Sequence, residues 1–317
     1  MNDHLVYVDD SLCGELHLTL ECRRAGVATS HDVDPAACAA ELAAWLDARA
    51  SRPCDALLVT TSRVHHGDMG PVLDVLVARR PALGRLALGA ITFPDFARGS
   101  DVPDDLDRDG SSWRLAVPGA DRLLNALPTL EELIVQASDI DVDEAAPIIA
   151  PRLRRLILRA DALDPRVIAT LGRGTFPALS HLELWLGPFE HLWGATASDL
   201  APLLRSAGLP ALRHLTLVSD LGDALIDELA DSALLPGLST LDLSHGVLGD
   251  RGAIRLRDCF PRFAHLDRLT LTGNAISRQG TAALRDLTPA IVTGYQRSAD
   301  AEEIRFDPPL VSLFNDW

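Results

Sequence analysis

Two histidines and one glutamate are the residues whose types and spacing could support chemistry. His181 and His214 each stand two positions after a leucine that opens a repeated segment, and Glu183 follows His181 by two. Such a group could act as acid and base or bind a metal ion. No zinc-protease, serine-hydrolase or phosphate-loop motif accompanies it. We therefore expect a protein without catalysis or cofactor, with a metal-dependent hydrolase at this group as an alternative.

A second metal-binding pattern lies at residues 105–110. Asp105, Asp107 and Asp109, followed by a glycine, match the opening of a calcium-binding loop. The twelfth position is Ala116, where a calcium loop has a bidentate glutamate. An acidic surface loop is the preferred interpretation, and calcium binding stays open.

A recurring L-x-x-L-x-L pattern predicts where His181, Glu183 and His214 lie in the fold. Its seven copies open at Leu83, Leu130, Leu153, Leu179, Leu212, Leu238 and Leu266. The spacings are 47, 23, 26, 33, 26 and 28 residues, so most units fit a repeat of ~20–29 residues and two carry insertions. One short strand cannot bury its leucines alone, so the units must stack into a parallel sheet. The return segments are expected to be helices at Asp223–Ser232, Asp250–Phe260 and Ser277–Leu287.

Two of these units resemble leucine-rich repeats of the ribonuclease-inhibitor type. They read LSTLDLSHGVLGDRGAIRL at 238–256 and LDRLTLTGNAISRQGTAAL at 266–284, and the likeness extends over residues 80–290. HLELWLG at 181–187 is also similar to a group of bacterial cytosolic leucine-rich-repeat proteins. The resemblance implies an α/β solenoid with a concave parallel sheet and convex helices. It also implies that the protein binds a partner, and it identifies no catalytic residue. Only one unit has an asparagine after the strand, Asn274.

Three parts are expected along the chain. Residues 1–54 form an N-terminal α+β cap, with a hairpin of two alternating runs at 4–8 and 15–20 and a helix at 34–50. Residues 55–293 form the solenoid, with an insertion at 89–125. Residues 294–317 form a C-terminal cap or tail. The tail could instead be a motif modified by a partner enzyme, which would make the chain a substrate or carrier.

The third, fifth and seventh repeat positions are expected to face the concave side. The predicted contacts there are Arg155, Arg159, His181, Glu183, Trp185, His214 and Asp242. Neighbouring strands lie ~4.8 Å apart, so His181 and His214 should be adjacent. An exposed tryptophan is costly unless something covers it, so Trp185 is the predicted hot spot. The loop after this strand adds Phe189 and Trp193 as candidates.

Composition limits the partner and the compartment. The net charge is −16, and all 29 basic residues are arginine, which excludes lysine chemistry. Such a chain repels phosphate backbones and favours a basic protein or peptide. It has no apolar stretch of membrane length, and its five cysteines form no C-x-x-C pair. We expect a cytoplasmic monomer that binds a protein or peptide and neither nucleic acid nor membrane.

Overall fold

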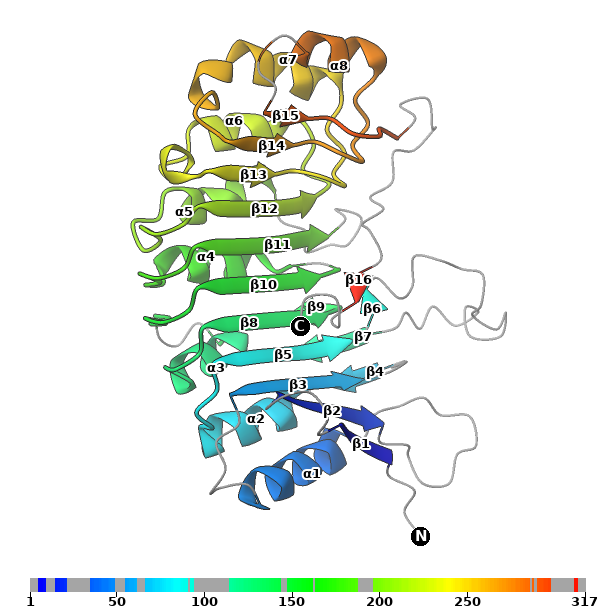
Figure 1. Cartoon of the computed structure of the whole chain (residues 1–317), viewed down its shortest axis with the longest axis vertical. Helices are drawn as coiled ribbons and strands as arrows, with labels where there is room; N and C mark the ends of the chain where they lie inside the picture. Colours follow the sequence, from blue (N-terminus) through cyan, green and yellow to red (C-terminus); the bar gives the residue numbers. More distant parts are fainter. Residues whose placement is uncertain are drawn as a thin grey trace, which may run out of the picture. The chain divides into compact units, whose positions relative to one another are not determined.

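The structure is a computed structural model of the 317-residue chain (Figure 1). It describes residues 5–9, 15–21, 35–48, 55–61, 66–90, 92–93, 114–143, 147–161, 163–187, 196–285, 287, 290–297 and 311–312. The chain divides into two compact units. Unit 1 comprises residues 1–153 and 310–317, and unit 2 comprises residues 154–309.

Unit 1 is built on five strands in the order β1–β2–β3–β5–β8. These are β1 Leu5–Asp9, β2 Glu15–Glu21, β3 Ala56–Thr61, β5 Arg85–Ala90 and β8 Glu132–Ala137. Only the β1–β2 pair is antiparallel. The helices are α1 Pro35–Ala48, α2 Gly70–Arg79 and α3 Ala120–Ala126, and they lie next to one another beside the sheet (Figure 1). The expected N-terminal hairpin and helix are confirmed.

A second set of paired strands in unit 1 shows that part of the expected insertion at 89–125 is regular structure. It joins β4 His66–Asp68, β7 Arg114–Val117 and β9 Asp139–Ile140 in parallel. Each of these strands follows a strand of the main sheet, so β7 and α3 belong to the repeat although β7 and all but the last residue of α3 fall within the expected insertion at 89–125. Two further short strands, β6 Thr92–Phe93 and β16 Val311–Ser312, pair antiparallel.

Unit 2 contains six parallel strands in chain order. They are β10 Arg155–Ala160, β11 His181–Gly187, β12 His214–Ser219, β13 Thr240–Asp242, β14 Arg268–Thr270 and β15 Ile291–Val292. The helical segments are α4 Pro165–Arg173, η2 Ala197–Leu200, α5 Ala201–Leu204, α6 Ala224–Ala230, η3 Leu235–Gly237, α7 Asp250–Asp258, η4 Phe260–Arg262 and α8 Arg278–Leu284. The three helices expected from the sequence are confirmed, with shorter ends.

The leucines of the repeat make the core. All seven leading leucines are buried, and so are the leucines three positions after each of them. Alternate strand residues point to opposite faces, so the residues between these leucines lie on the face without helices. The repeated strand–turn–helix unit with this buried leucine pattern confirms the leucine-rich-repeat architecture. Among the described residues, no helix is both long and apolar enough to cross a membrane.

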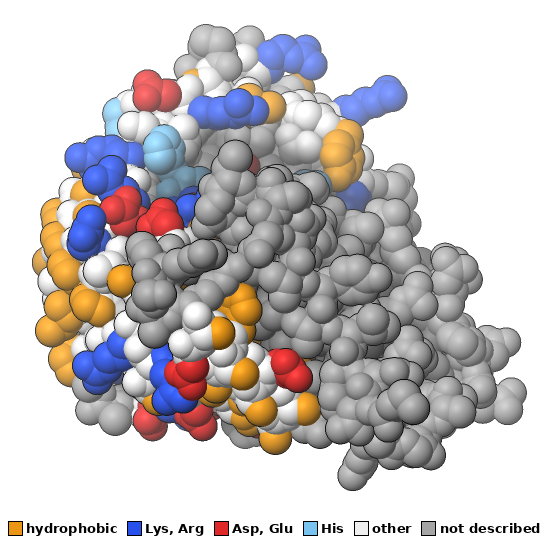
Figure 2. Space-filling view, turned by 60° about the horizontal axis from the view of Figure 1, so that its bottom comes forward, with side chains coloured by type: hydrophobic (Ala, Val, Ile, Leu, Met, Phe, Trp, Pro, Cys, Tyr) orange, Lys and Arg blue, Asp and Glu red, His pale blue; other side chains and the backbone are white. Residues whose placement is uncertain are grey.

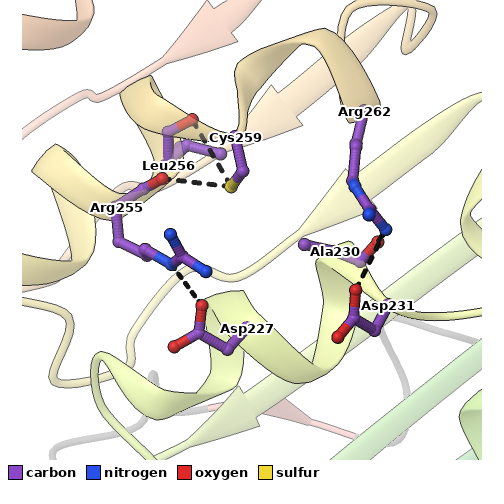
Figure 3. A network of polar contacts seen from close by, with 7 residues as sticks. All are labelled: Asp227, Ala230, Asp231, Arg255, Leu256, Cys259 and Arg262. Atoms are coloured by element: carbon purple, nitrogen blue, oxygen red, sulfur yellow. Dashed lines mark hydrogen bonds and ion pairs between the residues drawn. The ribbon is translucent and has the colours of Figure 1, made fainter.

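Polar contacts join successive helices on the outer side of unit 2. Arg255 of α7 pairs with Asp227 of α6, and the Arg262 guanidinium reaches the Asp231 carboxylate at 3.0 Å (Figure 3). The Cys259 thiol donates to the Arg255 carbonyl at 3.0 Å, and burial raises the pKa of this thiol. A raised pKa disfavours the thiolate, so Cys259 has the environment of a structural cysteine.

Asn274 holds together the turns that follow β13 and β14. Its side chain is fully buried; its amide nitrogen donates to the carbonyls of Leu243 and Leu271 at 2.8 and 3.1 Å. Its side-chain oxygen accepts from the Leu248 amide at 3.0 Å. In the next turn the Gln296 amide nitrogen donates to the same Leu271 carbonyl at 2.8 Å. Residues 291–297 therefore continue the pattern of the repeat beyond β14.

The turn after β13 carries a strained residue, which leads to a prediction. His245 has φ +62°, a left-handed conformation, and the equivalent position of the next repeat is Gly273 with φ +73°. A side chain in this region is strained, whereas glycine adopts it freely. His245→Gly is therefore expected to raise the free energy of unfolding by about 0.5 kcal/mol, as measured by denaturant titration. A loss of stability would mean that the ring contact of His245 with Tyr295 outweighs the strain.

Candidate functional site

The helix-free face of the unit 2 sheet brings together most of the predicted contact residues. At the start of five neighbouring strands, aligned side chains form what we call the entry row: Arg155, His181, His214, Thr240 and Arg268. A backbone feature sets this alignment. In four successive repeats one carbonyl accepts from two successive amides at the start of the next strand, as the Ser180 carbonyl does from Arg213 and His214, both at 3.0 Å.

The two histidines lie side by side, as the repeat spacing predicted. The ring centroids of His181 and His214 are 5.8 Å apart, with the rings tilted by 36°. His214 Nδ1 lies 2.8 Å from the Thr240 hydroxyl oxygen, which fixes the orientation of this ring. The entry row is half-buried along most of its length and exposed at Arg268. A ligand could therefore reach it from the helix-free side.

Glu183 of the next row accepts two hydrogen bonds. One carboxylate oxygen accepts from Arg159 Nε and from the Trp185 indole, each at 2.8 Å. The Arg159 guanidinium carbon also lies 5.4 Å from the centroid of the Trp185 ring, in a cation–π arrangement. Side chains from two neighbouring strands thus form one cluster, which we call the Glu183 cluster: Arg159, Glu183 and Trp185.

The expectation that Trp185 is exposed is wrong. Its side chain is 2% exposed and Arg159 is 3% exposed. The physical reason is the cluster itself: the indole N–H and the guanidinium meet one carboxylate, and the ring packs against the cation, so both can be buried. Trp185 is therefore not an exposed hot spot, and the Glu183 cluster is a buried structural element next to the entry row on the same face of the sheet.

The remaining predicted residues have different outcomes. Asp242 is half-buried and accepts from the Ser244 amide at 2.8 Å, so its carboxylate also shapes the turn after β13. Phe189 and Trp193 lie outside the described residues, as do Asp105, Asp107 and Asp109 of the possible calcium loop. Arg268 was missed, although it occupies the third position of LDRLTL, where Arg155, His181 and His214 stand in their repeats.

A metal centre at the histidine pair lacks a third ligand. Within the ranges that the structure describes, no three His, Cys, Asp or Glu side chains are grouped so that they could hold a metal ion. Glu183, the expected third ligand, uses one oxygen for Arg159 and Trp185. The arrangement is therefore better suited to hydrogen bonds and charge–charge interactions with a ligand than to binding a metal ion.

Charge is distributed unevenly over the described surface. In Figure 2, arginine and histidine side chains lie next to one another at the upper left, with acidic side chains beside them. On the helix-free face of unit 2, the entry row contains two arginines, two histidines and no acid, and the carboxylates of Glu183 and Asp242 stand in the following row. The face thus has a cationic row next to an anionic one.

Comparison with known proteins bears on the fold. A crystal structure of a protein from Bacteroides fragilis has a TM-score of 0.58 and 20% sequence identity, covering 81% of this chain and 68% of that one. The two proteins share a fold. An internalin from Listeria monocytogenes reaches a TM-score of 0.36 at 14% identity, covering 75% of this chain and 66% of its own. That TM-score is too low to support an argument. No family model matches the chain, and no curated protein does.

Proposed function

We propose that this leucine-rich-repeat protein is a non-catalytic scaffold that binds a protein or peptide on the helix-free face of unit 2. The observation that carries the proposal is the entry row, where five aligned side chains with hydrogen-bonding groups remain accessible on a rigid sheet. The strand–helix alternation of these repeats also favours the ribonuclease-inhibitor type. Accessible polar groups on a rigid scaffold are typical of a recognition surface.

The same geometry argues against catalysis. Acid–base chemistry usually needs a site that excludes water and tunes the pKa of its groups. The entry row is half-buried and exposed at Arg268, and the neighbouring Glu183 carboxylate is committed to Arg159 and Trp185. We therefore include the absence of catalysis in the proposal. The monomeric state expected from the sequence is also part of it.

The carrier alternative receives no support from the described part of the C-terminal segment. The backbone of Val311–Ser312 pairs antiparallel with Thr92–Phe93 in unit 1. An enzyme that binds the tail as an extended strand would need its main-chain amides and carbonyls. In this segment the pairing with Thr92–Phe93 already uses such groups. Binding on the entry row remains the better-supported function.

Affinity capture from a lysate of the source cells tests the proposed function. His181→Ala/His214→Ala is expected to lose a partner that the wild type retains, with at least a tenfold drop in recovered protein for about 1.4 kcal/mol of lost binding energy. Arg251→Ala/Arg278→Ala is the matched control, because both arginines are exposed on the outer helices α7 and α8. The proposal fails if the control loses the partner as fully as the histidine variant, or if all three proteins retain the same set.

A further inference from the structure

We propose that Thr216 and Asp242, on the helix-free face of unit 2, hold an arginine side chain of the bound protein or peptide. The two residues are aligned on the neighbouring strands β12 and β13, and we call them the acceptor pair. They stand in the row of side chains next to the entry row. The inference rests on the proposed function and specifies one chemical feature of its partner.

The Asp242 carboxylate is only partly satisfied within the fold. Its side chain is half-buried, and one oxygen accepts from the Ser244 amide at 2.8 Å. Among the described residues, the carboxylate forms no ion pair and no further hydrogen bond. A carboxylate that is partly withdrawn from water without a cation beside it loses solvation that the fold does not replace. A cation supplied by a ligand would replace it.

The other carboxylate of this row shows the contrast. Glu183 occupies the equivalent position on β11, two strands before Asp242. It accepts from Arg159 and from the Trp185 indole, each at 2.8 Å, so its charge is compensated inside the protein. Of these two carboxylates, Asp242 is therefore the one that is available to a partner.

Thr216 adds a second acceptor beside Asp242. It is half-buried, and its hydroxyl has no partner within the described ranges. Neighbouring strands lie ~4.8 Å apart, so aligned side chains on them are within reach of the separate N–H groups of one guanidinium. Arginine has five N–H donors in a planar fork, whereas the three donors of lysine share one nitrogen. The acceptor pair therefore fits arginine better than lysine.

The charged neighbours of Asp242 reduce the affinity without occupying the site. Arg268 lies diagonally across on β14, and its Nε donates to the Thr270 hydroxyl at 3.3 Å. Arg268 is exposed, so solvent and salt screen its repulsion of an incoming arginine. His214, the diagonal neighbour on β12, contacts the Thr240 hydroxyl through Nδ1. The net charge of −16 attracts a basic partner over longer distances.

Fluorescence anisotropy with labelled decapeptides tests the proposal on the full chain at physiological salt. The peptides are Gly–Ser repeats in which three positions are arginine, lysine or glutamate, and an uncharged repeat. The arginine peptide is expected to bind most tightly. Asp242→Asn should weaken its binding about tenfold, because the charge is lost while an oxygen remains for the Ser244 amide. Thr216→Val should weaken it about threefold.

Two further variants serve as controls for the charge. Asp231→Asn removes the same charge from a side chain that is 71% exposed on the outer side of unit 2, and it should bind the arginine peptide as the wild type does (Figure 3). Arg268→Gln removes a like charge next to the acceptor pair, so it should bind the arginine peptide at least as tightly as the wild type. Unfolding midpoints measured for all variants show whether each has kept its fold.

Four outcomes overturn the proposal. If Asp231→Asn weakens binding as much as Asp242→Asn does, the peptide responds to the charge of the whole chain. Equal binding of the lysine and arginine peptides would remove the role of the guanidinium. Binding of the glutamate peptide that Arg268→Gln loses would mean that the face recognises an acidic partner, so the proposed function would stand and the inference would fail. Binding of none of the peptides would reject the arginine site, and capture with the histidine variant would then decide the proposed function alone.

Discussion

Asn274→Ala is expected to lower the free energy of unfolding by about 3 kcal/mol, one of the two largest effects that the structure predicts. The Asn274 side chain is fully buried and satisfies the carbonyls of Leu243 and Leu271 and the amide of Leu248. Alanine leaves these backbone groups without that partner inside the turn. Chemical denaturation monitored by circular dichroism would measure the loss as a lower midpoint.

The matched control for Asn274 is Gln279→Ala. Gln279 is exposed on α8, so the substitution removes a side-chain amide that faces solvent. Alanine is also the better helix former. Its midpoint should stay within the error of the wild type. An Asn274→Ala protein as stable as this control would show that the turns hold without the asparagine.

The second large effect is expected for Glu183→Ala. The carboxylate accepts from Arg159, which is 3% exposed, and from Trp185, which is 2% exposed. Removing the carboxylate takes one partner from a nearly buried guanidinium and from a buried indole, which costs about 3 kcal/mol of folding free energy. Glu183→Gln retains an acceptor oxygen for the indole and should lose less. Thermal and denaturant unfolding of the two variants would rank them.

Asp231→Ala supplies the comparison for Glu183. It breaks the ion pair of Arg262 with Asp231, whose side chains are 59% and 71% exposed. An exposed pair contributes below about 1 kcal/mol. If Glu183→Ala destabilises the protein no more than Asp231→Ala does, the Glu183 cluster is not the element that holds β10 against β11.

The strands could be predicted because leucine spacing encodes them directly. Each L-x-x-L-x-L copy produced one strand of the main sheets, and the same spacing placed His181 beside His214. β7 and β15 were missed for a physical reason. Arg114–Val117 and Ile291–Val292 are short and lack a leading leucine, so only their pairing with neighbouring repeats defines them.

The sequence predicted which side chains of the site are aligned across the strands, but it did not predict which of them are buried. Strand alternation correctly places Trp185 on the helix-free face, but alternation alone cannot tell which side chains on that face remain accessible. The burial of Trp185 and Arg159 accompanies their joint contact with Glu183, which joins positions 24 residues apart in the chain. Arg268, in contrast, was predictable from its repeat position.

Site-specific photo-crosslinking tests most directly whether the entry row is the binding surface. A benzophenone amino acid replaces Thr240 on the helix-free face, or Arg251 on α7 as the control, and each protein is irradiated in a lysate of the source cells. We expect Thr240 to form a crosslink to a discrete protein partner and Arg251 to form none. A crosslink from Arg251 with none from Thr240 would contradict binding on the entry row.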